Sequence, residues 1–358
     1  MKVLFFLLDG DTNASSQHRV VQYLPILREQ GIEPHLSRPV PNPVYGRFVE
    51  YGRGTTAEKL GFYSLFLACR TLDVLRADRF DRVVIQRDLF PFGPPVLERW
   101  LWQRNPRLVL DTDDATYLRP PFTPNTVFQR LRRFDKVVEI ARHARSVSAA
   151  TREIADWMRQ HTPNVSVVPM AVDLRAYDRV QREPAARTPV VLGWAGTAGG
   201  LRYLDALGPA LRELAQRRSI LVRVISGGYR RVELPGVPVD VRPWRPETQL
   251  EDLASFDIGL VPLNDSPFER AKFPFKLLQY LALGTPAVVA RVGTAAELIR
   301  NGENGLLASA SHEWCDALER LIDDLELRRR LAARGRDTVA AQFTIERVAP
   351  LFIEAVCR

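Results

Sequence analysis

The chain has 358 residues, of which 46% are hydrophobic and 26% charged, and its formal net charge is +8. This length predicts about two domains, and this composition excludes a fibrous or a disordered protein. The first apolar run, residues 3–8, is too short for a signal-peptide core, and no later run is long enough to cross a bilayer. We therefore expect a cytoplasmic protein, either free or at the inner face of the membrane.

The first half of the chain alternates predicted strands with helices. A strand is expected at 2–8, a helix at 15–31 that stops at Gly31, and short β-branched strands at the following positions: 82–87, 107–111, 145–150 and 165–169. This rhythm is typical of a parallel, doubly wound sheet.

A polar stretch at 171–189 is the expected linker, and the rhythm then restarts. We expect a helix at 201–218, strands at 190–196, 220–228, 257–263 and 286–291, and helices from 323 onward with a break at Phe343–Thr344. The fold class is thus α/β, with two Rossmann-like domains, 1–170 and 190–340, facing across a cleft, and a final segment at 341–358. In such sheets ligands lie beyond the carboxyl ends of the strands.

Three cysteines, Cys69, Cys315 and Cys357, are too few and too scattered for a disulfide framework or a zinc site. A group of glycines, in contrast, stands between the strand at 190–196 and the next helix, where backbone N–H groups and the helix dipole can face an anion. The spacing differs from the dinucleotide fingerprint, and Ser226 stands where an NAD site would carry an acid. The simpler alternative is that the glycines serve only a tight turn.

Lysine is rare in this chain, because 45 of its 50 basic residues are arginine. Two of the five lysines, Lys272 and Lys276, lie four residues apart at the start of a predicted helix that ends at Gly284, before Pro286. Cations at a helix N-terminus oppose the dipole, so their placement suggests an anionic ligand. Lysine is a compact point charge that suits a diphosphate.

These segments resemble the donor domain of a family 4 (group 1) glycosyltransferase of the GT-B fold. The resemblance covers about 190–340 and is carried by "GWAGTAGGLRYL", "DIGLVPL", "ERAKFPFKLLQYLALGTPAVVA" and "VGTAAELIRNGENGLL". The stretch "VVPMAVDLRAYD" is similar to the family's interdomain signature, although Met170 and Ala171 replace its Asn-Gly.

The chain departs from the family at its pair of glutamates. Gln279 stands at the second position and Ala271 at the first, so Glu269 or Asp265 would have to reach the sugar instead. Gln279 can still bond ribose hydroxyls. Because the pattern Lys-x-x-Gln-Tyr resembles a sub-branch of the family, we interpret the chain as an active variant.

The resemblance implies a retaining, metal-independent hexosyltransferase with a nucleotide diphosphate sugar as donor and no cofactor. It also implies that 1–170 binds the acceptor, that 190–340 binds the donor, and that 341–358 forms a helix crossing back to the first domain. The catalytic cations would be Arg270, Lys272 and Lys276, which would stabilise the leaving diphosphate. The other expected donor-binding residues are Gly196, Thr197, Ala198, Ser226, Gly227, Trp244, Glu269 and Gln279.

In the first half, "VLDTDDATY" places Asp111, Asp113 and Asp114 at the end of a strand. An Asp-x-Asp motif can bind a metal in the other glycosyltransferase fold, but the two-domain rhythm disagrees with that fold, so no metal site is expected. Asp113 and Asp114 are candidates for a catalytic role at the acceptor hydroxyl, with capping of the next helix as the alternative. The remaining acceptor-side candidates are His18 and Arg19, placed in the loop after the first strand, and Arg87 and Asp88.

The stretches 96–104 and 128–145 combine apolar residues with arginines. They suit peripheral contact with a membrane or simply a solvated basic face. The acceptor is left open among a glycan, a lipid-linked sugar and a small molecule, and nucleic acid is not expected as a partner. Two alternatives to the transferase remain: a sugar-nucleotide epimerase of the same fold, and a basic binding module with a degenerate donor domain.

Overall fold

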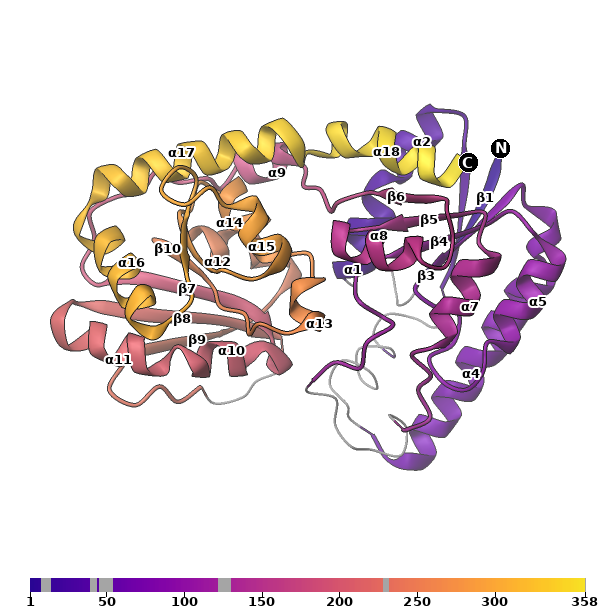
Figure 1. Ribbon diagram of the computed structural model, residues 1–358, viewed down its shortest axis with the longest axis horizontal. Coiled ribbons are helices and arrows are strands. Elements are labelled where there is room, and N and C mark those ends of the chain that lie inside the picture. Colours follow the sequence, from indigo (N-terminus) through magenta and orange to yellow (C-terminus); the bar gives the residue numbers. More distant parts are fainter. Residues whose placement is uncertain (8–13, 39–43, 45–53, 122–129, 228–231, 358) are drawn as a thin grey trace. The chain divides into compact units, whose positions relative to one another are not determined.

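The computed structural model describes residues 1–7, 14–38, 44, 54–121, 130–227 and 232–357. The chain forms two compact units (Figure 1). Unit 1 comprises 1–171 together with 345–358, and unit 2 comprises 172–344. The C-terminal helix therefore belongs to the same unit as the N-terminal strand.

Unit 1 is built on a six-stranded sheet in the order β2-β1-β3-β4-β5-β6, in which every adjacent pair is parallel. Its strands are β1 (Lys2–Phe6), β2 (Glu33–Ser37), β3 (Arg82–Gln86), β4 (Leu108–Thr112), β5 (Ser146–Ala149) and β6 (Val165–Val167). Its helices are α1 (Ala14–Arg19), η1 (Val21–Tyr23), α2 (Leu24–Glu29), α4 (Thr56–Leu75), η3 (Ala77–Arg79), α5 (Val96–Arg104), α7 (Lys136–His143), α8 (Arg152–Arg159) and α18 (Ile345–Cys357).

The single helix expected at 15–31 is wrong, because the segment forms α1, η1 and α2 in succession. Pro25 lies in the first turn of α2, where its missing N–H costs nothing, whereas within a continuous helix it would remove a hydrogen bond. Gly31, with a φ of +72°, ends the segment as expected. The expected break at Phe343–Thr344 is also present, between α17 (Leu325–Gln342) and α18.

Unit 2 contains a second parallel sheet of six strands, in the order β12-β11-β10-β7-β8-β9. Its strands are β7 (Val190–Thr197), β8 (Ile220–Gly227), β9 (Val239–Pro243), β10 (Ile258–Val261), β11 (Ala287–Ala290) and β12 (Leu306–Ala308). Its other elements, besides α17, are α9 (Leu174–Asp178), η4 (Ala198–Gly200), α10 (Leu201–Ala206), α11 (Gly208–Arg217), η5 (Pro246–Thr248), α12 (Gln249–Ala254), α13 (Pro267–Arg270), α14 (Phe275–Ala282), α15 (Gly293–Leu298) and α16 (Ser311–Asp323). The stretch expected to be only a linker contains α9.

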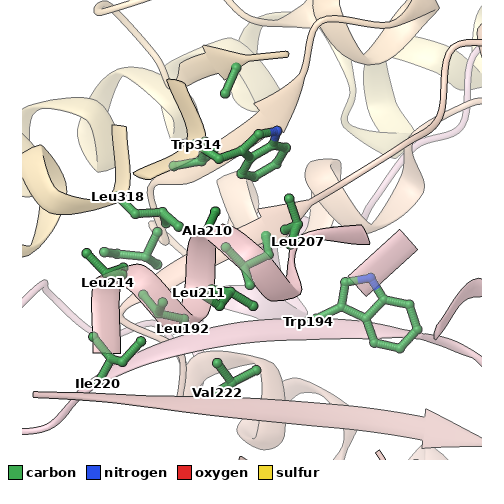
Figure 2. Packing of buried hydrophobic residues seen from close by; sticks show 14 of the residues in the cluster. Leu192, Trp194, Leu207, Ala210, Leu211, Leu214, Ile220, Val222, Trp314 and Leu318 are labelled. Carbon is green, nitrogen blue, oxygen red and sulfur yellow. The ribbon is translucent and has the colours of Figure 1, made fainter. Parts of the chain in front are cut away.

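One face of this sheet carries the main core of unit 2. Leu192 of β7 and Val222 of β8 are fully buried and belong to one cluster with Leu211 of α11 and with Trp314 and Leu318 of α16 (Figure 2). Residues 190, 192 and 194 alternate along β7 and share this cluster, as expected of a strand whose side chains point to opposite faces in turn.

The opposite face of the sheet lies against α14 and is shaped by glycines. A methyl group on Gly193 of β7 would overlap the ring of Phe256, and one on Gly259 of β10 would overlap the ring of Tyr280. The absence of side chains at these two positions lets the aromatic rings approach the backbone. This close packing sets the position of α14, the helix that carries Lys276.

The core of unit 1 joins the two ends of the chain. Phe352 of α18 stacks on Tyr23 at a ring-centroid distance of 4.6 Å and on Phe5 of β1 at 6.3 Å. Because α18 packs against one face of this sheet together with η1 and α2, we expect its removal to unfold unit 1. Within the described parts of both units, no helix combines the length and apolarity that a membrane span requires.

Candidate functional site

The glycine segment lies where β7 gives way to α10. β7 continues to Thr197, one residue beyond the expected end, and Ala198–Gly200 form a single 3-10 turn before α10. Thr197 and Gly199 are exposed. A side chain on Gly196 would collide with the indole of Trp194. Gly196 therefore has a packing role in addition to the anion-binding role expected of this segment.

Tyr280 connects this segment to α14. Its hydroxyl oxygen accepts a hydrogen bond of 3.0 Å from the backbone N–H of Ala195, and both groups are buried. Burial raises the pKa of the Tyr280 phenol, more than the hydrogen bond from Ala195 lowers it. The hydroxyl is consequently neutral at all ordinary pH values. Its hydrogen bond therefore holds the end of β7 against α14 throughout this range.

Lys276 lies in the first turn of α14 and contacts a neutral group. Its Nζ donates to Oε1 of Gln279 at 3.1 Å, and Nε2 of Gln279 donates in turn to the hydroxyl oxygen of Tyr177 at 3.1 Å. Gln279 is 0% exposed and Tyr177 is also buried. Burial lowers the pKa of the Lys276 ammonium from 10.5 to about 8, so at neutral pH it remains mostly a cation.

The other two expected cations differ in their surroundings. Arg270 is exposed and forms two hydrogen bonds with Asp265, of 2.5 and 3.0 Å, which largely compensate its charge. Lys272 is half-buried. Among the described residues, neither Lys272 nor Lys276 has a carboxylate within 4.0 Å. Of the three expected cations, these two lysines are therefore the ones whose charge no described carboxylate compensates, so they can attract an incoming anion.

Glu269, one of the residues expected to reach the sugar, is held inside unit 2. Only 1% exposed, it accepts hydrogen bonds from the hydroxyl of Tyr203 at 2.6 Å, from Arg202 at 3.4 Å and from Ser266. Glu269 therefore joins α13 to α10, and in this arrangement its oxygens are occupied. Ala271 is also buried, with 0% exposure.

A glycine also positions the segment that carries the cations. Gly293, at the start of α15, has a φ of +47°, and a methyl group there would overlap the backbone carbonyl of Arg270. Only glycine adopts this backbone conformation without strain while leaving room for α13. The backbone at Arg270 thus lies directly against the start of α15.

Ser226, Gly227 and Trp244 lie at adjacent strand ends. The backbone N–H of Trp244 donates to the carbonyl of Ser226 at 3.0 Å, and its indole N–H donates to Gln249 at 2.9 Å. The Ser226 hydroxyl is buried without a partner among the described residues. These residues remain predicted contacts of the donor.

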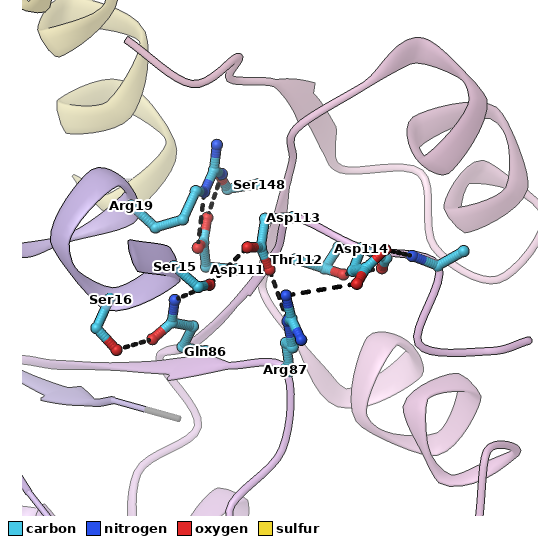
Figure 3. Close-up of polar contacts among 11 residues, drawn as sticks. Ser15, Ser16, Arg19, Gln86, Arg87, Asp111, Thr112, Asp113, Asp114 and Ser148 are labelled. Atoms are coloured by element: carbon cyan, nitrogen blue, oxygen red, sulfur yellow. Dashed lines mark hydrogen bonds and ion pairs between the residues drawn. The ribbon is translucent and has the colours of Figure 1, made fainter. Parts of the chain in front are cut away.

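In unit 1, Asp113 is the centre of a polar network at the carboxyl ends of β3 and β4 (Figure 3). It accepts from Nε of Arg87 at 2.6 Å and from the hydroxyl of Ser15 at 2.5 Å, and Ser15 accepts from Gln86 at 2.9 Å. Burial alone would raise the pKa of Asp113, but Arg87 and Ser15 together lower it to about 2. An acid this strong is a poor proton acceptor near neutral pH, so Asp113 is suited to orienting groups.

Arg87 adopts a backbone conformation that is rare outside glycine, with a φ of +65°. Its N–H donates to the carbonyl of Asp111 at 2.8 Å, and its guanidinium lies 3.7 Å from Asp114. Asp114 does not cap a helix at this point, because its carboxylate accepts from the next N–H, that of Ala115, within a turn. Strained backbone of this kind accumulates at functional sites.

The expected loop position of His18 and Arg19 is wrong, because both residues belong to α1. Arg19 is 1% exposed and pairs with Asp111 at 2.5 Å, while its Nη2 donates to Ser148 at 2.9 Å (Figure 3). This buried pair fixes α1 to β4 and β5. His18 is only half-buried, and its acceptor-side role remains a prediction.

Asp88 lies beside a buried lysine. Nζ of Lys136 is 3.9 Å from Asp88 and 3.2 Å from Glu98, and it donates to the carbonyl of Phe90. Lys136, another of the five lysines, is thus a structural cation with acidic partners. The acceptor role of Asp88 likewise remains a prediction.

The structure brings the donor-side candidates of unit 2 together through residues that sequence reasoning missed. Tyr280 connects β7 to α14, Tyr203 connects α10 to α13, and Tyr177 contacts Gln279. Tyr280 had a signal, because it follows Gln279 in the motif that carries the family resemblance. Tyr177 and Tyr203 also lie in stretches that carry the resemblance, but nothing in those stretches indicates that Gln279 and Glu269 are their partners.

The family model described as "Glycosyl transferases group 1" matches residues 190–324. A lipopolysaccharide core biosynthesis glycosyltransferase, LpsE, of Rhizobium meliloti (strain 1021) is 25% identical over 191 residues, covering 50% of this chain and 53% of that protein. A GDP-mannose-dependent alpha-(1-6)-phosphatidylinositol dimannoside mannosyltransferase of Mycobacterium tuberculosis (strain ATCC 25177 / H37Ra) is 29% identical over 199 residues, covering 52% of this chain and 50% of that protein. In both comparisons, the chain spans about half the length of the relative.

Solved structures resemble the whole chain in fold. Sucrose-phosphate synthase from Thermosynechococcus elongatus has a TM-score of 0.68 at 15% identity, covering 99% of this chain and 97% of that one. Anabaena HepE, in complex with UDP and glucose, also has a TM-score of 0.68, at 16% identity, covering 100% and 99%. The expected α/β fold class is confirmed: the chain has the GT-B fold, and its residues 190–324 match the model of the group 1 glycosyl transferases.

Proposed function

We propose that this protein is a retaining, metal-independent glycosyltransferase that moves a sugar from a nucleotide diphosphate sugar to an acceptor hydroxyl. The observation that carries the proposal is Lys276, a half-buried lysine at the start of α14 whose ammonium contacts Gln279 and has no carboxylate partner among the described residues. Taking a cation out of water is unfavourable unless an anion compensates it. A donor diphosphate supplies that anion.

The reaction breaks the bond between the anomeric carbon and the diphosphate oxygen and forms a bond from that carbon to the acceptor oxygen. Negative charge therefore grows on the departing diphosphate. Lys272 and Lys276 stabilise that charge electrostatically in place of a metal ion. The acceptor proton passes to an oxygen of the donor phosphate, which is consistent with Asp113 being too acidic to take it.

The polar network of unit 1 supports a binding role for the acceptor. Arg87 and Asp114 are partly exposed beside the buried Asp113, so they can meet hydroxyl groups while Asp113 fixes their orientation. The relatives that act in lipopolysaccharide core and phosphatidylinositol mannoside synthesis favour a glycan or lipid-linked acceptor.

The first experiment is thermal unfolding with UDP, GDP, ADP and several of their sugar conjugates, each with and without EDTA. A ligand at 100 times its dissociation constant stabilises the native state by about 2.7 kcal/mol. We expect one nucleotide series to raise Tm, with no change on adding EDTA. A shift that disappears with EDTA would contradict metal independence, and no shift with any nucleotide would contradict the donor site.

Incubation with the stabilising nucleotide sugar then separates a transferase from an epimerase. A transferase leaves the sugar unchanged, apart from slow hydrolysis, until an acceptor is added. Conversion to an isomeric nucleotide sugar without acceptor would favour the epimerase. Proton NMR of the anomeric region detects this conversion directly.

A further inference from the structure

Gln279 gives Lys276 a neutral partner at a position where a carboxylate would pair with it. The two residues are three apart on α14, and their contact, Nζ to Oε1, is 3.1 Å. Residues three apart on a helix are neighbours on its surface. A glutamate at 279 would therefore place a negative charge against the ammonium.

The orientation of the Gln279 amide follows from its two neighbours. An ammonium group can only donate hydrogen bonds, so the amide oxygen must face Lys276 and the amide nitrogen must face Tyr177. Nε2 meets the hydroxyl oxygen of Tyr177 at 3.1 Å, and Gln279 is fully buried. Both ends of this amide are thus engaged within unit 2, which gives Gln279 a task other than the expected bond to a ribose.

Several charged groups on the elements packed against α14 are paired with residues other than Lys276. Arg336 of α17 pairs with Asp178 of α9, and Asp252 of α12 lies 3.4 Å from Arg242. On α13, Glu269 accepts from Tyr203 and Arg270 pairs with Asp265. The remaining neighbours, β10 and β11, contain no charged residue.

We propose that Gln279 is a positioning residue, which holds the ammonium of Lys276 in place through a neutral oxygen and so leaves its positive charge available to the donor diphosphate. This inference rests on the proposed function. A carboxylate here would compensate the charge of Lys276 at close range and, because Coulomb interactions are strong in partly buried sites, compete with the diphosphate. Glutamine in place of the family glutamate then strengthens the attraction between Lys276 and the donor diphosphate.

The test compares Gln279→Glu with the wild type by titration calorimetry, using UDP, GDP and ADP as probes between pH 6.5 and 9.5. At pH 7 we expect Gln279→Glu to weaken binding by about tenfold, the order of one charge-assisted hydrogen bond. The pH above which affinity declines should move upward, because a neighbouring carboxylate favours the protonated lysine. Gln216→Glu, the same change at an exposed position of α11, is the matched control and should leave both quantities unchanged.

A second variant, Gln279→Met, keeps the volume and neutrality but removes the oxygen. Affinity should fall by only a few-fold, and its decline should begin at a lower pH, because the ammonium loses its hydrogen bond. The opposite displacements of the two pH profiles are a readout that a merely structural role would not produce. If Gln279→Glu does not fold, Gln279→Met against the wild type decides the matter: an unchanged affinity and pH profile in Gln279→Met would overturn the positioning role.

The outcomes separate this inference from the proposed function. If the wild type binds none of UDP, GDP and ADP, the proposed function itself is contradicted. A second outcome would overturn the positioning role of Gln279 and leave the donor site intact. In that outcome the wild type binds a nucleotide, Lys276→Met binds it more weakly, and both Gln279 variants keep the wild-type affinity and pH profile.

Discussion

The hydroxyl oxygen of Tyr280 lies 3.0 Å from the backbone nitrogen of Ala195, and this hydrogen bond joins the helix that carries Lys276 to the strand that leads into the glycine segment. The two residues are 85 positions apart in the chain. Both groups are buried, so each would lack a partner if the other were removed. The donor-side geometry of unit 2 therefore depends on a phenol that need not touch the donor.

Tyr280→Phe should lower both stability and nucleotide affinity. The variant leaves the Ala195 N–H buried without an acceptor, which costs about 1–3 kcal/mol of unfolding free energy. Urea unfolding measures this loss, and titration with the nucleotide identified by thermal unfolding measures affinity. Tyr117→Phe in unit 1, which keeps the ring stacked on Trp157, is the control and should bind the nucleotide normally. Unchanged nucleotide affinity in Tyr280→Phe would show that the position of the end of β7 does not contribute to nucleotide binding.

Lys276→Met should weaken nucleoside diphosphate binding by about 10- to 100-fold, the range of a charge-assisted hydrogen bond. Wild-type affinity should decline as pH rises above about 8, because burial lowers the pKa of the ammonium to about that value. The variant has no ammonium to titrate, so its affinity should lack this decline. Calorimetric titrations from pH 6.5 to 9.5 check both statements. Lys59→Met, the same change in unit 1, is the control and should bind the nucleotide like the wild type. A decline that persists in Lys276→Met would assign the titration to another group.

Gly293→Ala should disturb the cation segment as well as the fold. A φ of +47° strains any residue with a Cβ, and here the methyl group would also overlap the carbonyl of Arg270. We expect a loss of more than about 2 kcal/mol in unfolding free energy together with weaker nucleotide binding. Gly302→Ala separates the two effects, because Gly302 has a φ of +83° and open space around it. It should lose stability through strain alone and keep its affinity.

Asp113→Asn should destabilise unit 1 in a pH-dependent way. The folded-state pKa of Asp113, about 2, lies below its ordinary 3.8. The ionised group therefore contributes stability, about 2 kcal/mol, that is present above pH 4 and is lost as pH falls through 2. The gap in unfolding free energy between wild type and variant should be constant from pH 5 to 8 and close below pH 4. A gap that widens on acidification would contradict the assigned shift.

Much of the fold was predictable from local sequence. Short β-branched runs separated by helical segments predict parallel strands, and the structure has strands at all of the expected places. The strands β2, β9 and β12 and the helix α9 were not predicted. Proline and charged or polar residues interrupt the apolar pattern of β2 (EPHLS) and β9 (VDVRP), β12 has only three residues, and α9 lies in a polar stretch with prolines nearby. Such elements are decided by the neighbours they pack against.

The candidate site divides in the same way. The rarity of lysine and the strand-to-helix glycines pointed to Gly196, Lys272 and Lys276 directly, because composition and turn chemistry are properties of the local sequence. The actual environment of Glu269 was not predictable, since Tyr203, its partner, is 66 residues away. Similarly, no pattern around Arg19 indicates that Asp111 neutralises it inside unit 1.

The sequence by itself determined the alternation of strands and helices, the two-unit organisation expected of it, and the concentration of lysine at the start of one helix. Only the tertiary structure decided that Arg202 and Tyr203 meet Glu269, and that Lys276 meets Gln279 and Tyr177 but no described carboxylate. The physical reason is that periodicity and turn chemistry act between residues near in sequence, whereas burial and ion pairing depend on which distant segments meet. Tyr177 and Gln279, 102 residues apart, meet only because the chain has folded.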